Sequence, residues 1–190
     1  MTGGDGLNNM NATEAQRALN DADCLYTDAQ VQQALDRMAQ AITQSLADRD
    51  PLILCVMTGG IIPAGHLLTR LHFPLQIDYI HATRYRGDTA GGRLQWIVRP
   101  QHSLKGRTVL IIDDILDEGI TLNAIIEDCW ASGASEVFTA VLINKKHNRK
   151  EPVPIHFVGL ETEDRYLFGY GMDYKGYLRN APGIYAVKGL

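Results

Sequence analysis

Apolar residues at helical spacing mark three segments of the chain. They recur over about 28–48, where Thr27 and Gln30 form a capping-box pattern at the start. The same spacing, of about 3.6 residues, returns over about 61–70 and 121–132. We therefore predict a helix in each segment.

A second pattern predicts strands between these helices. Largely apolar runs at 52–57, 108–112 and 136–143 are typical of strands that are buried on both faces. Apolar and polar residues alternate near 75–79 and 94–98, as in strands with one buried face. Strands that alternate with helices predict an α/β fold in which helices flank a central parallel sheet.

The same patterns divide the chain into three parts. Residues 1–24, which begin rich in Gly and Asn, are expected to be a flexible N-terminal segment. Residues 25–150 carry the regular pattern and form the α/β core, and residues 151–190, irregular and rich in aromatics, form a small hood. The polar, glycine-rich stretch 83–93 is expected to be a mobile, functional loop.

Composition and charge narrow the class of protein. Apolar residues make up 45% of the chain and charged residues 21%, values typical of a globular domain. Eighteen Lys and Arg against 22 Asp and Glu give a formal net charge of −4. This balance argues against a coat protein for nucleic acid or an anionic-membrane binder, so neither partner is expected.

The location of the protein is inferred from what the sequence lacks. No apolar run approaches the roughly 18 residues that a membrane span needs, and the first residues show no signal pattern. Cys24, Cys55 and Cys129 are odd in number and lack zinc-ligand spacing, which is typical of reduced thiols. We expect a cytoplasmic protein that is not exported.

The strongest chemical signal is the run VLIIDDILDEGITL at 109–122. Ligands of open α/β sheets bind beyond the carboxyl ends of the strands, where Asp113 and Asp114 are expected to stand. Adjacent like charges favour a cation or a polyhydroxyl ligand, and the following loop, 117–121, presents backbone N–H groups suited to a phosphate. The alternative is an ordinary strand-to-helix turn in which Asp and Thr cap the helix.

Two common nucleotide motifs are missing from the sequence. No G-x-x-x-x-G-K-[ST] occurs, and Gly169-Tyr-Gly171 begins a G-x-G-x-x-G pattern without completing it. With these two motifs excluded, the run at 109–122 is best interpreted as a phosphate-binding loop preceded by carboxylates that can bind the hydroxyls of a diol.

The run at 109–122 resembles the phosphoribosyl pyrophosphate motif of type I phosphoribosyltransferases. With Met57-Thr58-Gly59-Gly60, Arg84-Tyr85, Lys145 and the segment 165–180, the chain is similar to the hypoxanthine-guanine phosphoribosyltransferase family over about residues 25–185. The resemblance implies a purine-salvage enzyme that transfers 5-phosphoribosyl from phosphoribosyl pyrophosphate to hypoxanthine or guanine. It further implies Mg²⁺ as cofactor and a homodimer or homotetramer.

The resemblance also implies roles for single residues. Asp117 matches the general base near ring nitrogen 7 of the purine, and Asp173 matches a ligand of Mg²⁺. The remaining matches are Asp113 and Asp114 at the ribose and a Mg²⁺-bound water, Glu118, Gly119, Ile120 and Thr121 at the 5′-phosphate, Thr58, Gly59, Arg84 and Arg179 at pyrophosphate, and Lys145, Tyr166 and Leu167 at the purine. Lys145 is the residue that donates to the 6-oxo group and so selects against adenine.

One departure from the family affects the pyrophosphate site. Thr58 stands where the family often has a Lys, so one cation is missing there. We expect Arg84 or Arg86, in the polar loop, to supply that charge when the loop closes over the site.

Other interpretations stay open at this stage. The donor motif also fits a xanthine-guanine or pyrimidine phosphoribosyltransferase, or a regulator that senses phosphoribosyl pyrophosphate and binds nucleic acid. Lys145 lies in NKKHNRK, and such basic runs are usually solvated faces. The aromatics of 165–180 suit ordinary packing. The six histidines show no partner at a persuasive spacing and are expected on the surface or in the core.

Overall fold

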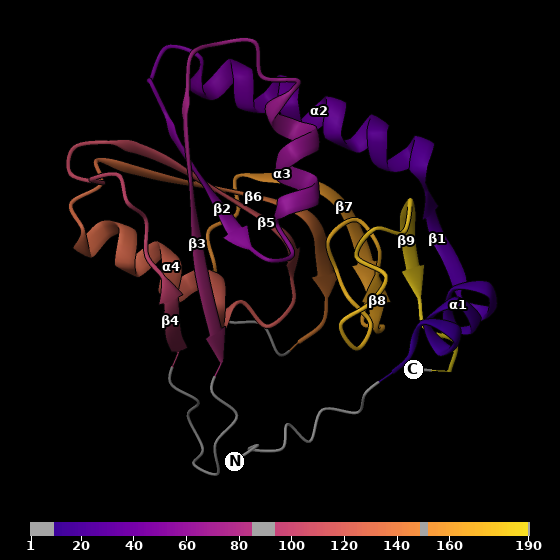
Figure 1. Cartoon of the computed structure of the whole chain (residues 1–190). Helices are drawn as coiled ribbons and strands as arrows, with labels where there is room; N and C mark the ends of the chain where they lie inside the picture. Colours follow the sequence, from indigo (N-terminus) through magenta and orange to yellow (C-terminus); the bar gives the residue numbers. More distant parts are fainter. Residues whose placement is uncertain (1–9, 85–93, 149–151, 190) are drawn as a thin grey trace, which may run out of the picture.

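The computed structural model describes residues 10–84, 94–148 and 152–189, without the side chains of Arg84 and Leu94 (Figure 1). The helices are α1 (Ala12–Asp21), α2 (Asp28–Leu46), α3 (Ile61–Leu68) and α4 (Ile120–Ala131). The strands are β1 (Asp23–Thr27), β2 (Leu52–Met57), β3 (Gln76–Arg84), β4 (Leu94–Val98), β5 (Thr108–Leu116), β6 (Glu136–Lys146), β7 (Phe157–Glu163), β8 (Leu167–Phe168) and β9 (Gly183–Ala186).

A six-stranded sheet in the order β4-β3-β2-β5-β6-β7 forms the centre of the molecule. All neighbours in it run parallel except β4, which is antiparallel to β3. Helices α2 and α3 lie over one face, and α4 covers the other (Figure 1). The predicted α/β fold, with helices that flank a mostly parallel sheet, is confirmed.

Strand alternation divides the core into two layers. Ile53 of β2 and Leu110 of β5 point toward α2 and α3, whereas their neighbours Leu54 and Ile111 point toward α4. All four side chains are fully buried. Strands that are buried on both faces need continuous apolar runs, which is why 52–57 and 108–112 show no polar alternation.

A second, antiparallel sheet in the order β1-β9-β8 forms the hood beside the main sheet (Figure 1). Its central pairing joins Asp23 to Ala186 and Thr27 to Gly183, so segments from both ends of the sequence build it. The expectation of a flexible segment over 1–24 is therefore wrong for residues 12–24. They form α1, which a capping box between Asn11 and Glu14 starts, and the first part of β1.

The boundary expected at residue 150 does not separate the two sheets. Strand β7 (Phe157–Glu163) pairs with β6 in the main sheet, although its residues were expected in the hood. The hood in turn takes β1 from the N-terminal side of that boundary.

The structure bears only in part on the expected polar loop and on membrane-spanning helices. Residues 85–93, the greater part of the expected loop 83–93, lie outside the described residues, and Arg86 lies among them. Among the helices that are described, none has the length and apolar character needed to cross a membrane.

Candidate active site

Four parallel strands end at one edge of the main sheet. The registers Cys55 to Ile112, Leu116 to Asn144 and Lys145 to Thr162 place the ends of β2, β5, β6 and β7 next to each other. This is the edge at which open α/β sheets bind their ligands.

A cavity of about 290 Å³ lies at this edge, between the main sheet and the hood. It is lined by Asp114, Ile115, Asp117, Lys145, Tyr166, Leu167, Met172 and Asp173. Six of these eight residues were expected at the site from the sequence; Ile115 and Met172 were not. Residues that lie 59 positions apart in the sequence thus share one pocket.

Lys145 is a buried cation held between two carboxylates. Its Nζ lies 3.1 Å from Oδ2 of Asp117 and 3.2 Å from Oδ1 of Asp164, and its side chain is 9% exposed. The next residue, Lys146, is 63% exposed and pairs with Glu161 on the outside. The interpretation of NKKHNRK as a solvated basic face is therefore wrong for Lys145, because strand alternation turns it inward.

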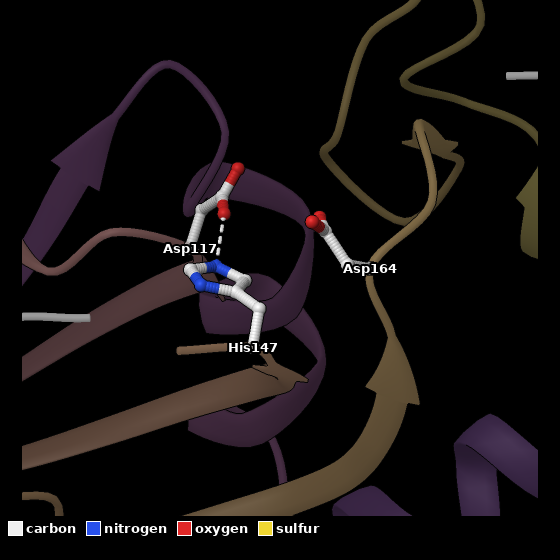
Figure 2. A group of neighbouring side chains, drawn as sticks. All are labelled: Asp117, His147 and Asp164. Carbon is white, nitrogen blue, oxygen red and sulfur yellow. Dashed lines mark hydrogen bonds and ion pairs between the residues drawn. The ribbon is translucent and has the colours of Figure 1, made fainter. Parts of the chain in front are cut away.

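His147 is a site residue that the sequence analysis missed. Its side chain is 5% exposed, and its Nε2 lies 2.7 Å from Oδ1 of Asp117. Figure 2 shows the imidazole and the Asp117 carboxylate pointing toward one another, with Asp164 facing them from the segment after β7. The signal in the sequence was the spacing, since His147 follows Lys145 by two positions and falls on the same side when the alternation of β6 continues one residue past its end.

The contacts of Asp117 set its acidity. Burial by itself raises the pKa of this carboxyl, but hydrogen bonds and charge from His147 and Lys145 outweigh burial and bring the pKa below its ordinary value. Asp117 is therefore held in its ionised form.

Asp113 and Asp114 lie within β5 rather than beyond it, because the strand continues to Leu116. Burial raises the pKa of Asp113 well above its ordinary value, and the charge of Asp114 adds to the effect. Burial also raises the pKa of Asp114, although a hydrogen bond with Asp113 and the charge of Arg179 oppose it. A cation or hydroxyl donors at this place would relieve the repulsion.

The loop after β2 packs closely against Asp114 and the hood. The Met57–Thr58 peptide is cis. A Cβ atom on Gly59 would lie 2.1 Å from Oδ2 of Asp114, and one on Gly171 would lie 2.0 Å from the carbonyl oxygen of Gly59. Glycine at both positions lets the three segments meet at the edge of the cavity.

The loop from Asp117 to Gly119 leads directly into α4. Gly119 at the N-cap has a φ of 86°, in the left-handed region that favours glycine. As a glycine, the N-cap residue itself forms no side-chain cap hydrogen bond. The N-cap is therefore Gly119 rather than an Asp or a Thr, and backbone amides at such a helix start suit an anion.

Arg179 and Asp173 link the hood segments at the mouth of the cavity. Arg179 donates to the carbonyl oxygen of Gly171 at 2.6 Å, and its guanidinium lies 2.6 Å from Oδ1 of Asp173. The other oxygen of Asp173 accepts from the N–H of Gly176 at 2.8 Å. The side chain of Arg84, expected at the same site, lies outside the described residues.

Comparison with known proteins defines the class to which this fold and site belong. Residues 21–175 match the family model of the phosphoribosyl transferase domain. The chain belongs to this family, as the motif at 109–122 predicted.

Within that class, the chain belongs among the hypoxanthine-guanine phosphoribosyltransferases. The hypoxanthine-guanine-xanthine phosphoribosyltransferase of Tritrichomonas foetus is 31% identical over 165 residues, which cover 86% of this chain and 90% of the relative. The hypoxanthine-guanine enzyme of Bacillus subtilis is 29% identical over 165 residues, 86% of this chain and 92% of the relative. A solved hypoxanthine phosphoribosyltransferase from Staphylococcus aureus has a TM-score of 0.85 at 27% identity and covers 95% of this chain and 97% of its own.

The predicted family, fold and enzyme class are thereby confirmed. The matches favour a hypoxanthine-guanine transferase of purine salvage over the other interpretations, which were a xanthine-guanine enzyme, a pyrimidine enzyme and a regulator that senses phosphoribosyl pyrophosphate.

Proposed function

We propose that this chain transfers the 5-phosphoribosyl group of phosphoribosyl pyrophosphate to hypoxanthine or guanine. The products are inosine or guanosine 5′-monophosphate and pyrophosphate. The observation that carries the proposal is the single cavity in which Asp114, Asp117, Lys145 and Tyr166 meet beside the amide-rich start of α4. Groups that suit the ribose, a purine and a phosphate lie within reach of one molecule.

Lys145 and Tyr166 form the proposed purine site. The Lys145 ammonium donates to the 6-oxo group, whereas the amino group of adenine offers it no acceptor. Tyr166 is 45% exposed, and its ring packs edge-on against Tyr174 with a centroid separation of 5.3 Å, so it offers a surface for a flat base. Leu167 closes the cavity from β8.

The proposed chemistry is a displacement at the anomeric carbon. Positive charge develops on the ribose ring as pyrophosphate leaves, and the carboxylates of Asp113 and Asp114 favour that charge. Asp117 accepts the proton at ring nitrogen 7 as general base, a role worth roughly a hundred- to ten-thousand-fold in rate.

Two loops are proposed to hold the phosphates. The amides of Glu118, Gly119 and Ile120 and the hydroxyl of Thr121 bind the 5′-phosphate at the start of α4. Thr58, Gly59 and Arg179 contact pyrophosphate. Arg84 or Arg86 supplies the charge that Thr58 lacks; an unchanged affinity for pyrophosphate in both R84A and R86A would refute this part.

The residues at the ribose end fit Mg²⁺. Asp113, Asp114 and Asp173 offer the hard carboxylate oxygens that Mg²⁺ prefers, and positive charge would offset the repulsion between the adjacent carboxylates of Asp113 and Asp114. Asp173 would hold the ion, in part through water, and Asp113 and Asp114 would hold one of its waters. When bound, Mg²⁺ neutralises charge on the pyrophosphate leaving group.

The test supplies phosphoribosyl pyrophosphate and Mg²⁺ with hypoxanthine, guanine, xanthine, adenine or uracil in separate reactions. Release of pyrophosphate, together with the matching nucleotide, is expected with hypoxanthine or guanine and not with adenine or uracil. Turnover with xanthine decides whether the chain resembles the Tritrichomonas foetus enzyme in that respect. Turnover with uracil alone, or with no base, would overturn the proposal.

We also propose a homodimer or homotetramer that works in the cytoplasm. The family resemblance supports the assembly, and the three free thiols of Cys24, Cys55 and Cys129 support a reducing compartment. Light scattering of the purified chain and fractionation of the cells that express it test the two parts separately.

A further inference from the structure

We propose that His147 is a positioning residue for the general base, and that it orients the Asp117 carboxylate through a hydrogen bond to Oδ1. The inference rests on the proposed function, since it concerns the same cavity. No role for a histidine followed from the motif or from the resemblance.

The geometry around Asp117 carries the inference. Oδ1 lies 2.7 Å from Nε2 of His147, and Oδ2 lies 3.1 Å from Nζ of Lys145. Each carboxylate oxygen therefore has its own partner, and the plane of the carboxylate is defined from both sides. One partner alone would leave the carboxylate free to rotate about its Cβ–Cγ bond.

Chemistry fixes the direction of the bond. An ionised carboxylate only accepts hydrogen bonds, so Nε2 of His147 must carry its hydrogen in both the neutral and the protonated imidazole. Nε2 therefore cannot take a further proton from Asp117. His147 acts by holding the base in place rather than by relaying the proton.

Charge balance explains why a histidine suits this place better than a second lysine. Asp117 and Asp164 face His147, and Lys145 bridges the two carboxylates. Asp117, Asp164 and Lys145 together carry one negative charge, which leaves Asp117 able to accept a proton. A second lysine in place of the imidazole would cancel that charge.

The same groups argue against a metal ion at this place. One ligand atom each from Asp117, His147 and Asp164 lie within 4.8 Å of one another. The ammonium of Lys145 already contacts both carboxylates, so a cation bound there would have to displace it.

The test compares H147A and H147Q with the unmutated chain. Alanine removes the donor, and we expect kcat to fall roughly ten-fold, as for the loss of one hydrogen bond to a charged group, with the KM for phosphoribosyl pyrophosphate within two-fold. Glutamine places an amide N–H near the position of Nε2 and should restore most of kcat. A purely structural role would not separate the two variants in this way.

The pH profile gives a second readout. Without the His147 donor the pKa of Asp117 rises, so the acidic limb of kcat against pH should move to higher pH in H147A. Where alanine disturbs the fold, H147L keeps the volume without the donor and should give the same shift. An H147A or H147L enzyme with the kcat and acidic limb of the unmutated chain would overturn the inference, as would an H147Q enzyme no better than H147A.

The matched control is H102A, because His102 also pairs with an aspartate. Its Nδ1 lies 2.8 Å from Oδ2 of Asp78, outside the cavity. This variant should keep kcat and the pH profile. A lack of nucleotide synthesis in the unmutated chain with every base would refute the proposed function instead, and so is distinguishable from a failure of the His147 inference.

Discussion

Lys145 shows how the surroundings of one residue fix its chemistry. Its ammonium is removed from water but keeps two carboxylate partners, Asp117 and Asp164, which offset the loss of solvation. An ammonium so anchored faces the cavity as a donor and cannot serve as an acceptor.

The K145A variant should lose discrimination between 6-oxo and 6-amino purines. We expect the ratio of kcat/KM for hypoxanthine over adenine to fall by at least about ten-fold, the value of one hydrogen bond to a charged group. Competition assays with the two bases measure it. Lys146 is the matched control, since it is exposed and pairs with Glu161, and K146A should leave the ratio unchanged. Equal ratios in the two variants would place the selectivity elsewhere.

The D117N variant separates catalysis from binding. An amide cannot accept the proton of ring nitrogen 7 as the carboxylate does, so kcat should fall roughly a hundred- to ten-thousand-fold with little change in the KM for phosphoribosyl pyrophosphate. D164N removes another partner of Lys145 and should reduce kcat far less. Similar kcat values for D117N and the unmutated chain would remove Asp117 as the base.

The sequence predicted the site best where neighbours in space are neighbours in sequence. Asp113 to Thr121 are contiguous, so their spacing alone indicated a phosphate loop. His147 reaches Asp117 from the position directly after β6, 30 positions further along the chain, and nothing local to Asp117 marks that pairing. Only the alternation from Lys145 indicated it, and the surrounding basic residues of NKKHNRK obscured that signal.

At the scale of elements, a glycine contact joins the loop after β2 to the hood. Gly171 has a φ of 109°, and a Cβ there would lie 2.0 Å from the carbonyl oxygen of Gly59. The contact holds the proposed pyrophosphate loop against the hood segment that carries Asp173. Glycine is required at position 171 for two reasons: the positive φ is unfavourable for other residues, and the close carbonyl oxygen leaves no room for a Cβ atom.

The G171A variant should be less stable than G176A. Both glycines have positive φ, and a Cβ on Gly176 would meet nothing within 4 Å. The backbone penalty, on the order of 1 kcal/mol, is therefore common to both, and the clash adds to it in G171A alone. Unfolding in urea measures the two free energies. Equal losses of stability would show that the close approach relaxes without cost.

The elements that sequence predicted poorly are those defined by distant partners. Residues 52–57 and 136–143 carry their own apolar signal and fold as predicted. Strand β1 (Asp23–Thr27) is short and half-exposed, and it exists because it pairs with β9, about 160 positions away. Such a pairing leaves no local pattern, so residues up to 24 were expected to be flexible.

At the scale of the whole molecule, Tyr170 connects the hood to the core. Its hydroxyl donates to Asp28 and lies in hydrogen-bond contact with Gln32, both on α2. Its ring also packs against His66 of α3, at a centroid separation of 5.3 Å. The side chain is buried, so this contact orders the hood relative to the helices that cover the main sheet.

Tyr170 should make the stability of the whole chain depend on alkaline pH. Burial, followed by the hydrogen bond to Asp28, raises the pKa of Tyr170 to about 12, above its ordinary value of 10.0. The folded state therefore disfavours the phenolate. The contribution of the Tyr170 hydroxyl to the free energy of unfolding is fully present below pH 10 and is lost as the pH rises toward about 12.

The Y170F variant keeps the ring and removes the hydroxyl. At pH 8 it should be less stable by about 1 kcal/mol, the net value of a hydrogen bond, and the difference from the unmutated chain should shrink above pH 10. Urea unfolding between pH 8 and 11 measures both. Cys55 and Cys129, whose pKa values burial raises to about 12, contribute alkaline sensitivity equally in the two proteins and cancel in the difference. Tyr177, which is 42% exposed, provides the control, and a Y177F variant with the same convergence would show that the effect does not come from the contact between hood and core.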